Sequence, residues 1–82
     1  MEDCLFCRII AGEIPSRKVH EDADTFAFED IHPQAPTHVL IVPKVHRNSV
    51  NDLQAGDESL CAALFAAART IATARGIQDK GY

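Results

Sequence analysis

The chain has 82 residues, a formal net charge of −4 at pH 7 and a hydrophobic content of 46%. This length predicts one small domain with a marginal core, and the acidic balance argues against non-specific nucleic-acid binding, which needs a basic face. No apolar stretch is long enough to cross a bilayer, and the N-terminus has no signal-peptide pattern. Three cysteines, an odd number, suit a reducing compartment, so we expect a cytoplasmic protein with no membrane partner.

The N-terminal half predicts a short helix followed by a β-hairpin. Residues 4–11 carry apolar side chains at helical spacing, and Gly12 is the expected left-handed cap. Residues 18–21 and 25–30 are predicted strands, joined by the turn of residues 22–24 and paired antiparallel.

A third strand and a long helix are predicted in the second half. The run Val39-Leu40-Ile41-Val42, with prolines on both sides, predicts a strand from His38 to Val42 that is central and buried on both faces. Residues 48–53 fit one helical turn, and residues 57–75 a long helix that ends at Gly76. The predicted apolar stripe of this helix is Leu60, Cys61, Leu64, Phe65, Ala68, Ile71 and Ala72.

A few polar residues have two interpretations when spacing alone is considered. Cys4 and Cys7 form a C-x-x-C pair that can bring two thiolates to one Zn²⁺, or they are small hydrophobic residues of the first helix. Asp30 fits the cap of a turn at a strand end. His38 fits a hydrogen-bonded residue at the edge of the core. His20, like His32 and Lys44, is expected to face solvent.

The segment DIHPQAPTHVLIVPKVH, preceded by CLFCRIIAGEIPSRKVHEDADTFAFE, closely resembles the N-terminal two-thirds of histidine triad (HIT) proteins of the nucleotide-hydrolase and phosphoramidase branch. The family's H-x-H-x-H signature is absent from the 82 residues, because none of the four histidines lie two apart. The resemblance implies an α+β fold with a HIT-like antiparallel sheet, of which three strands out of an expected five are present. We expect one HIT-like domain over residues 1–82, truncated at its C-terminus.

The resemblance also implies roles for individual residues. It implies a purine nucleotide as partner, with the carboxylate of Asp30 accepting hydrogen bonds from both ribose hydroxyls. His38 matches a histidine that supports the catalytic imidazole. Zinc, where relatives with this C-x-x-C pair bind it, is structural, and its ligands match Cys4, Cys7 and His46, with the fourth ligand in the triad. The apolar base pocket matches Phe6, Ile9, Ile14, Phe28 and Ile31, which are otherwise plain core residues.

The activity that the resemblance implies is nucleophilic catalysis on a nucleoside phosphoramidate, aminoacyl-adenylate or dinucleoside polyphosphate. The middle triad histidine attacks the α-phosphorus, and water hydrolyses the resulting nucleotidyl-histidine without any metal. We also expect a homodimer. Because the nucleophile is not in this sequence, we expect nucleoside binding without turnover. Two alternatives remain open: a non-catalytic nucleotide- or protein-binding module, and a small zinc-binding interaction domain.

Overall fold

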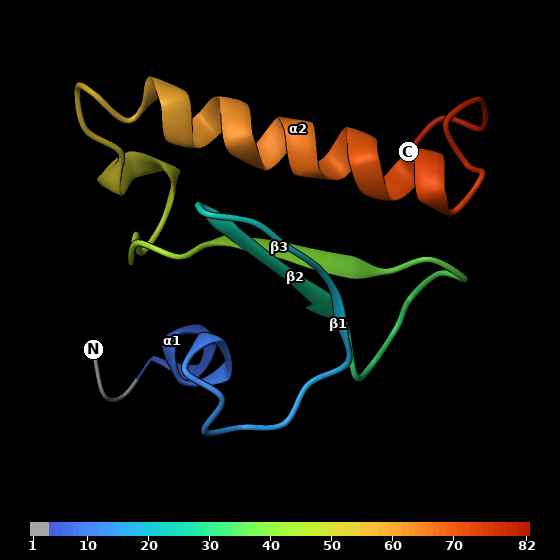
Figure 1. Ribbon diagram of the computed structural model, residues 1–82, viewed down its shortest axis with the longest axis horizontal. Helices are drawn as coiled ribbons and strands as arrows, with labels where there is room; N and C mark the ends of the chain where they lie inside the picture. Colours follow the sequence, from blue (N-terminus) through green and yellow to red (C-terminus); the bar gives the residue numbers. More distant parts are fainter. Residues whose placement is uncertain (1–3) are drawn as a thin grey trace.

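The computed structural model describes residues 4–82, which form three layers with a helix on each face of a small antiparallel sheet (Figure 1). Helix α1 (Leu5–Ile10) lies below the sheet in this view and helix α2 (Glu58–Ala74) lies above it. Strands β1 (Lys18–Glu21), β2 (Thr25–Glu29) and β3 (Val39–Pro43) pair in the order β1-β2-β3. The predicted α+β class, with three strands and two helices, is confirmed.

Strand β2 organises the core because both of its faces are buried. Phe26 and Phe28 form a buried cluster with Ile9 of α1. Successive side chains of a strand alternate between faces, so Thr25 and Ala27 lie on the side of α2, and both are 0% exposed. Partly buried residues complete the cluster on the α1 side: Ile10, Ile14, Leu40 and Val42.

Strand β3 differs from its prediction. It was expected to be the central strand and buried on both faces, but β2 holds the centre and every residue of β3 is only half-buried. Within residues 4–82, β3 pairs with β2 alone, so its other edge has no neighbouring strand. Among residues 4–82 the continuous apolar run therefore lies at one edge of the sheet and not at its centre.

Helix α2 packs against all three strands. No helix in the described part of the chain is long and apolar enough to cross a membrane. The predicted stripe is correct at Leu60 and Ile71, which are buried, and wrong at Phe65, which is 79% exposed. Phe65 lies about 120° around the helix axis from Ile71, whereas Ala67 lies only about 40° from it. Ala67 therefore faces the sheet and is 2% exposed.

The segment from β3 to α2 contains the predicted single turn, a 3₁₀ helix η1 (Val50–Asp52). Arg47 closes this segment by donating two hydrogen bonds to the Asp57 carboxylate, at 3.0 and 3.1 Å. The pair raises the pKa of Arg47 and lowers the pKa of Asp57. Asp57 occupies the N-cap position of α2, so its pair with Arg47 connects the chain beyond β3 to the start of the long helix.

The turn between β1 and β2 is held by the carboxylate of Asp22. It accepts hydrogen bonds from the backbone N–H of Asp24 at 2.9 Å and from the N–H and hydroxyl of Thr25, both at 2.8 Å. His20 donates a further bond from Nε2 at 2.9 Å. The prediction that His20 faces solvent is wrong, because the ring is half-buried against Asp22.

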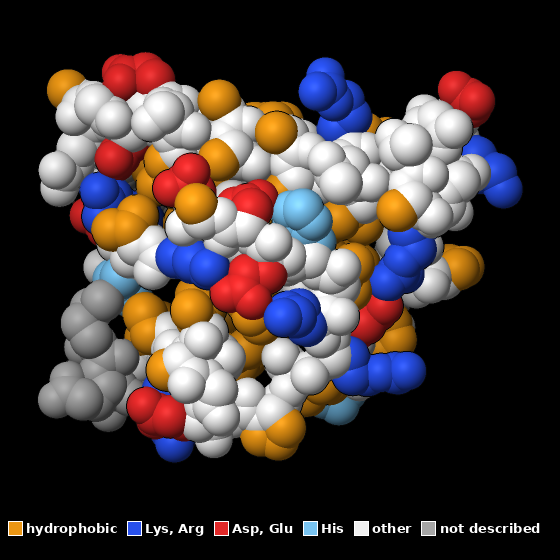
Figure 2. Space-filling view, in the orientation of Figure 1, with side chains coloured by type: hydrophobic (Ala, Val, Ile, Leu, Met, Phe, Trp, Pro, Cys, Tyr) orange, Lys and Arg blue, Asp and Glu red, His pale blue; other side chains and the backbone are white. Residues whose placement is uncertain are grey.

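Charged side chains of opposite sign lie next to one another across the middle of the face shown in Figure 2. Glu21 of β1 pairs with Lys18 at 3.2 Å and with Lys44 at 2.8 Å. Lys44 was expected to be an exposed strand-end residue; its side chain is 30% exposed and ion-paired. Lys18 and Lys44 are therefore both paired with the same carboxylate.

Candidate functional site

An apolar cavity of about 270 Å³ lies between α1, the loop after it and the ends of β2 and β3. Its lining combines residues that are far apart in the sequence and includes a single carboxylate, that of Asp30. All six residues expected to bind nucleotide line it: Phe6, Ile9, Ile14, Phe28, Asp30 and Ile31.

The walls of this cavity are preformed, whereas its rim is open. Ile9 and Phe28 are buried in the core, and the ring of Phe6 packs against that of Phe28 with centroids 6.0 Å apart. Ile31 is 83% exposed, so it contributes apolar surface to the mouth of the cavity without contributing to the core. A flat apolar group entering the cavity would cover Ile31 and the exposed part of Phe6.

Asp30 connects the cavity to His38. Its Oδ1 accepts a hydrogen bond from the backbone N–H of His32 at 2.8 Å, which is the turn-capping geometry that the sequence also allowed. Its Oδ2 lies 3.3 Å from Nε2 of His38. The Gln34 backbone N–H donates to Nδ1 of His38 at 3.0 Å. Since Nδ1 accepts, the neutral ring carries its proton on Nε2, facing the carboxylate.

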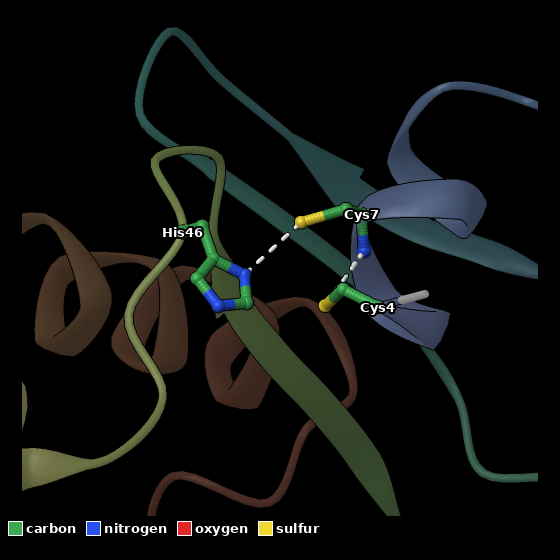
Figure 3. Close-up of side chains that lie close together, drawn as sticks. All are labelled: Cys4, Cys7 and His46. Atoms are coloured by element: carbon green, nitrogen blue, oxygen red, sulfur yellow. Dashed lines mark hydrogen bonds between the residues drawn. The ribbon is translucent and has the colours of Figure 1, made fainter. Parts of the chain in front are cut away.

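A second group of side chains, Cys4, Cys7 and His46, meets at the N-terminus of α1 (Figure 3). Cys4 caps the helix, and its sulfur accepts a hydrogen bond from the Cys7 backbone N–H at 3.4 Å. His46 comes from the segment after β3 and places Nδ1 3.2 Å from the Cys7 sulfur. One donor atom from each residue lies within 4.8 Å of the other two.

The donor set of this cluster fits zinc. Two sulfurs and one imidazole are common zinc ligands, and bond lengths of about 2.0–2.3 Å require donor atoms at the spacing seen here. The hydrogen bond from the Cys7 backbone lowers the pKa of Cys4 to about 7. The neighbouring Cys4 sulfur raises the pKa of Cys7. The first thiolate therefore forms readily, and a divalent cation would offset the repulsion that opposes the second.

Sequence patterns missed the residues that support these two groups. Asn48 faces Nε2 of His46 with its Oδ1 at 2.8 Å, and the Gln34 backbone holds His38. Arg47 and Asp57 are ten residues apart in a segment without periodicity, so no local pattern could have indicated their pairing. The sequence offered one indication of the role of Asn48, its position two residues after the candidate ligand His46.

A larger and more open hollow of about 380 Å³ lies between β1 and the C-terminal half of α2. Its basic side chains include Lys18, paired with Glu21, and Arg75, paired with Glu29. His20, which also lines it, is bound to Asp22. The hollow is larger than the apolar cavity, and Arg17 also lines it, but the charges of Lys18 and Arg75 are neutralised by their acidic partners.

Comparisons with known proteins decide the family. The sequence profile described as "Scavenger mRNA decapping enzyme C-term binding", a HIT-like family, matches residues 3–81. The purine nucleoside phosphoramidase of Escherichia coli K12 is 43% identical over 81 residues, covering 99% of this chain and 68% of that protein. The chain belongs to the histidine triad family. Protein HitA of Neisseria gonorrhoeae, a further relative, is 39% identical over 79 residues, which cover 96% of this chain and 74% of HitA.

Solved structures show the same HIT fold. A HIT family hydrolase from Legionella pneumophila superposes with a TM-score of 0.93 at 48% identity, covering 98% of this chain and 71% of its own. A HIT family hydrolase from Clostridium thermocellum gives a TM-score of 0.95 at 40% identity, covering 100% of this chain and 71% of its own. The predicted family and fold are therefore confirmed.

Proposed function

We propose that this chain carries the nucleoside-binding half of a HIT-type nucleotidyl hydrolase or phosphoramidase site, and that the apolar cavity receives a purine base. The observation that supports this most directly is that all six candidate residues line one cavity. The similarity to a purine nucleoside phosphoramidase points to the same ligand class.

The base would lie against Phe28 and Phe6, whose rings already pack together, and it would cover the exposed side chain of Ile31. Asp30 would accept hydrogen bonds from the ribose hydroxyls. Its carboxylate has about four lone-pair sites, so it can keep the bonds to His32 and His38 while it binds the sugar.

The reaction proposed for the complete HIT site is attack of a neutral imidazole on the α-phosphorus, followed by hydrolysis of the nucleotidyl-histidine. His38 would support that imidazole from its place beside Asp30. The attacking histidine is not among these 82 residues, so the chain itself should bind without turnover. Proposed substrates of the complete site are nucleoside phosphoramidates and dinucleoside polyphosphates.

A structural zinc ion is proposed at Cys4, Cys7 and His46, whose donor atoms lie within 4.8 Å of one another. The ion would hold the N-terminus of α1 to the segment after β3, and the reaction itself needs no metal. Zinc content of the purified chain, measured by atomic emission, tests this assignment. A homodimer in the cytoplasm completes the proposal, in keeping with free thiols at Cys4, Cys7 and Cys61.

Two exposed aliphatic residues allow the pocket to be tested without disturbing the core. Ile31 is 83% exposed and lines the cavity, whereas Val50 is 79% exposed and lies in η1. Ile31→Ala should weaken adenosine monophosphate binding about fivefold, the equivalent of about 1 kcal/mol of lost apolar contact, and Val50→Ala should not. Calorimetry in which both variants bind like the wild type would refute the assignment of the cavity.

A further inference from the structure

The imidazole of His46 makes one contact through each ring nitrogen. Nδ1 lies 3.2 Å from the Cys7 sulfur, inside the candidate metal cluster. Nε2 lies 2.8 Å from Oδ1 of Asn48, outside that cluster. Asn48 is not one of the three candidate ligands, so its contact with the ring must have a different role.

The contact with Asn48 determines which nitrogen of His46 can bind a metal. An amide oxygen only accepts hydrogen bonds, so Nε2 must carry the ring proton and donate it to Asn48. The lone pair of the neutral ring then lies on Nδ1, directed at the sulfurs. Metal-binding histidines generally donate their second ring N–H to an oxygen in this way, which fixes both the tautomer and the ring orientation.

The backbone around Asn48 is itself held in place. Its N–H donates to Oδ2 of Asp52 in η1 at 3.1 Å. Arg47 donates from Nη1 to the carbonyl of His46 at 2.9 Å while it binds Asp57. Both the ring and the main chain of His46 are therefore positioned by residues outside the donor set.

We propose that Asn48 is a positioning residue that holds His46 in the Nε2–H tautomer and presents Nδ1 to a metal bound by Cys4 and Cys7. This inference rests on the zinc site proposed above. The competing interpretation is that Asn48 is an exposed surface residue whose contact with the ring has no effect on the site.

Zinc affinity, measured on the chain by competition with a chelating indicator, separates these interpretations. Asn48→Ala should bind zinc about 10–100-fold more weakly than the wild type, the usual effect of removing such a partner. Asn48→Asp keeps an oxygen acceptor and should bind within about threefold of the wild type, by the same argument. The matched control is Asn51→Ala, at an exposed asparagine of η1 with no hydrogen bond to His46 among residues 4–82.

A wild-type chain that binds no zinc would overturn both the metal site and the role of Asn48. The zinc site itself is supported if the wild type binds zinc tightly, Cys7→Ser abolishes the binding and Cys61→Ser retains it. If Asn48→Ala and Asn51→Ala then bind zinc with equal affinity, the role of Asn48 alone is overturned. Long-range ¹H–¹⁵N spectra of the metal-free chain at pH 8 provide a second readout. They should show the Nε2–H tautomer of His46 in the wild type and a loss of that preference in Asn48→Ala; an Nδ1–H tautomer in the wild type would refute the inference.

Discussion

Nε2 of His38 lies 3.3 Å from Oδ2 of Asp30, and the backbone of Gln34 holds the other nitrogen of the same ring. The acidic residue proposed to bind the ribose is thus joined to the histidine proposed to support catalysis. A ligand that binds Asp30 would change the hydrogen bonding of His38 directly, because the two side chains contact one another.

Replacing Asp30 should therefore weaken nucleotide binding. Asp30→Asn keeps an oxygen that can accept from His32 but removes the charge that strengthens bonds from the ribose hydroxyls, a loss of roughly 1.5–3 kcal/mol. Calorimetry with adenosine monophosphate measures it, and Asp24→Asn, in the β1–β2 turn, is the control. Unchanged affinity in Asp30→Asn would mean that Asp30 only caps the turn.

The chain should show no hydrolysis of adenosine phosphoramidate above the uncatalysed background. The physical reason is that no histidine among the 82 residues belongs to an H-x-H-x-H motif, so the proposed nucleophile is not present. Chromatographic detection of released adenosine monophosphate is a suitable assay. Turnover that disappears in His38→Ala would contradict this expectation, since it would show that another histidine can act as the nucleophile.

Asp22 should make the folding stability of the chain depend on pH, with a loss of stability in acid. The hydrogen bond from His20, followed by those from Thr25 and Asp24, holds the pKa of the Asp22 carboxyl well below its usual range. A depressed folded-state pKa contributes stability above the unfolded value of about 3.9, and the contribution is lost as the pH falls below it. Asp22→Asn should thus melt below the wild type at pH 7, and the difference should shrink below about pH 4.

The control for this experiment is Asp24→Asn, whose carboxylate has no assigned hydrogen bond or ion pair among residues 4–82. Its melting temperature should stay parallel to that of the wild type across the same pH range. A wild-type and Asp22→Asn difference that is constant from pH 7 to pH 3 would contradict the role given to the Asp22 charge.

Local sequence patterns predicted the elements well because their causes are local. The cap positions of α2 are Asp57 and Arg75, which are the predicted first and last residues of this helix. Gly76 adopts the expected left-handed conformation, with φ of +70°. Phe65 and Ala67 could not be sorted in the same way. A broad apolar stripe does not indicate which of its margins faces the sheet, and that choice depends on packing between distant segments.

Some residues of the candidate site could likewise be identified from the sequence, and others only from the folded structure. The family resemblance identified Asp30 and the pocket residues from the sequence, and the structure brings them to one cavity. Asn48 and the pair of Arg47 and Asp57 act through contacts made only after the segment beyond β3 has folded back to α2. Side-chain partners of this kind leave no periodic trace in the sequence.

In solution the 82-residue chain should be self-associated and not a well-folded monomer. Its accessible surface is 5899 Å², whereas a compact monomer of 9.0 kDa is expected to expose about 4,900 Å². Phe65 and Tyr82 are 79% and 70% exposed, and they line one open hollow beside Arg69. Strand β3 has an edge that pairs with no other strand of residues 4–82, and such edges favour association.

Sedimentation velocity at micromolar concentration, combined with a thermal melt, measures this directly. Association that buries the exposed ring should weaken in Phe65→Ala, while Val50→Ala, at an equally exposed position outside the hollow, should sediment like the wild type. Phe65 contributes little to the core, so the variant should not lose folding stability through lost internal packing. A wild-type chain that sediments as a monomer and melts cooperatively would show that the surface left open by β3 and α2 is tolerated in water.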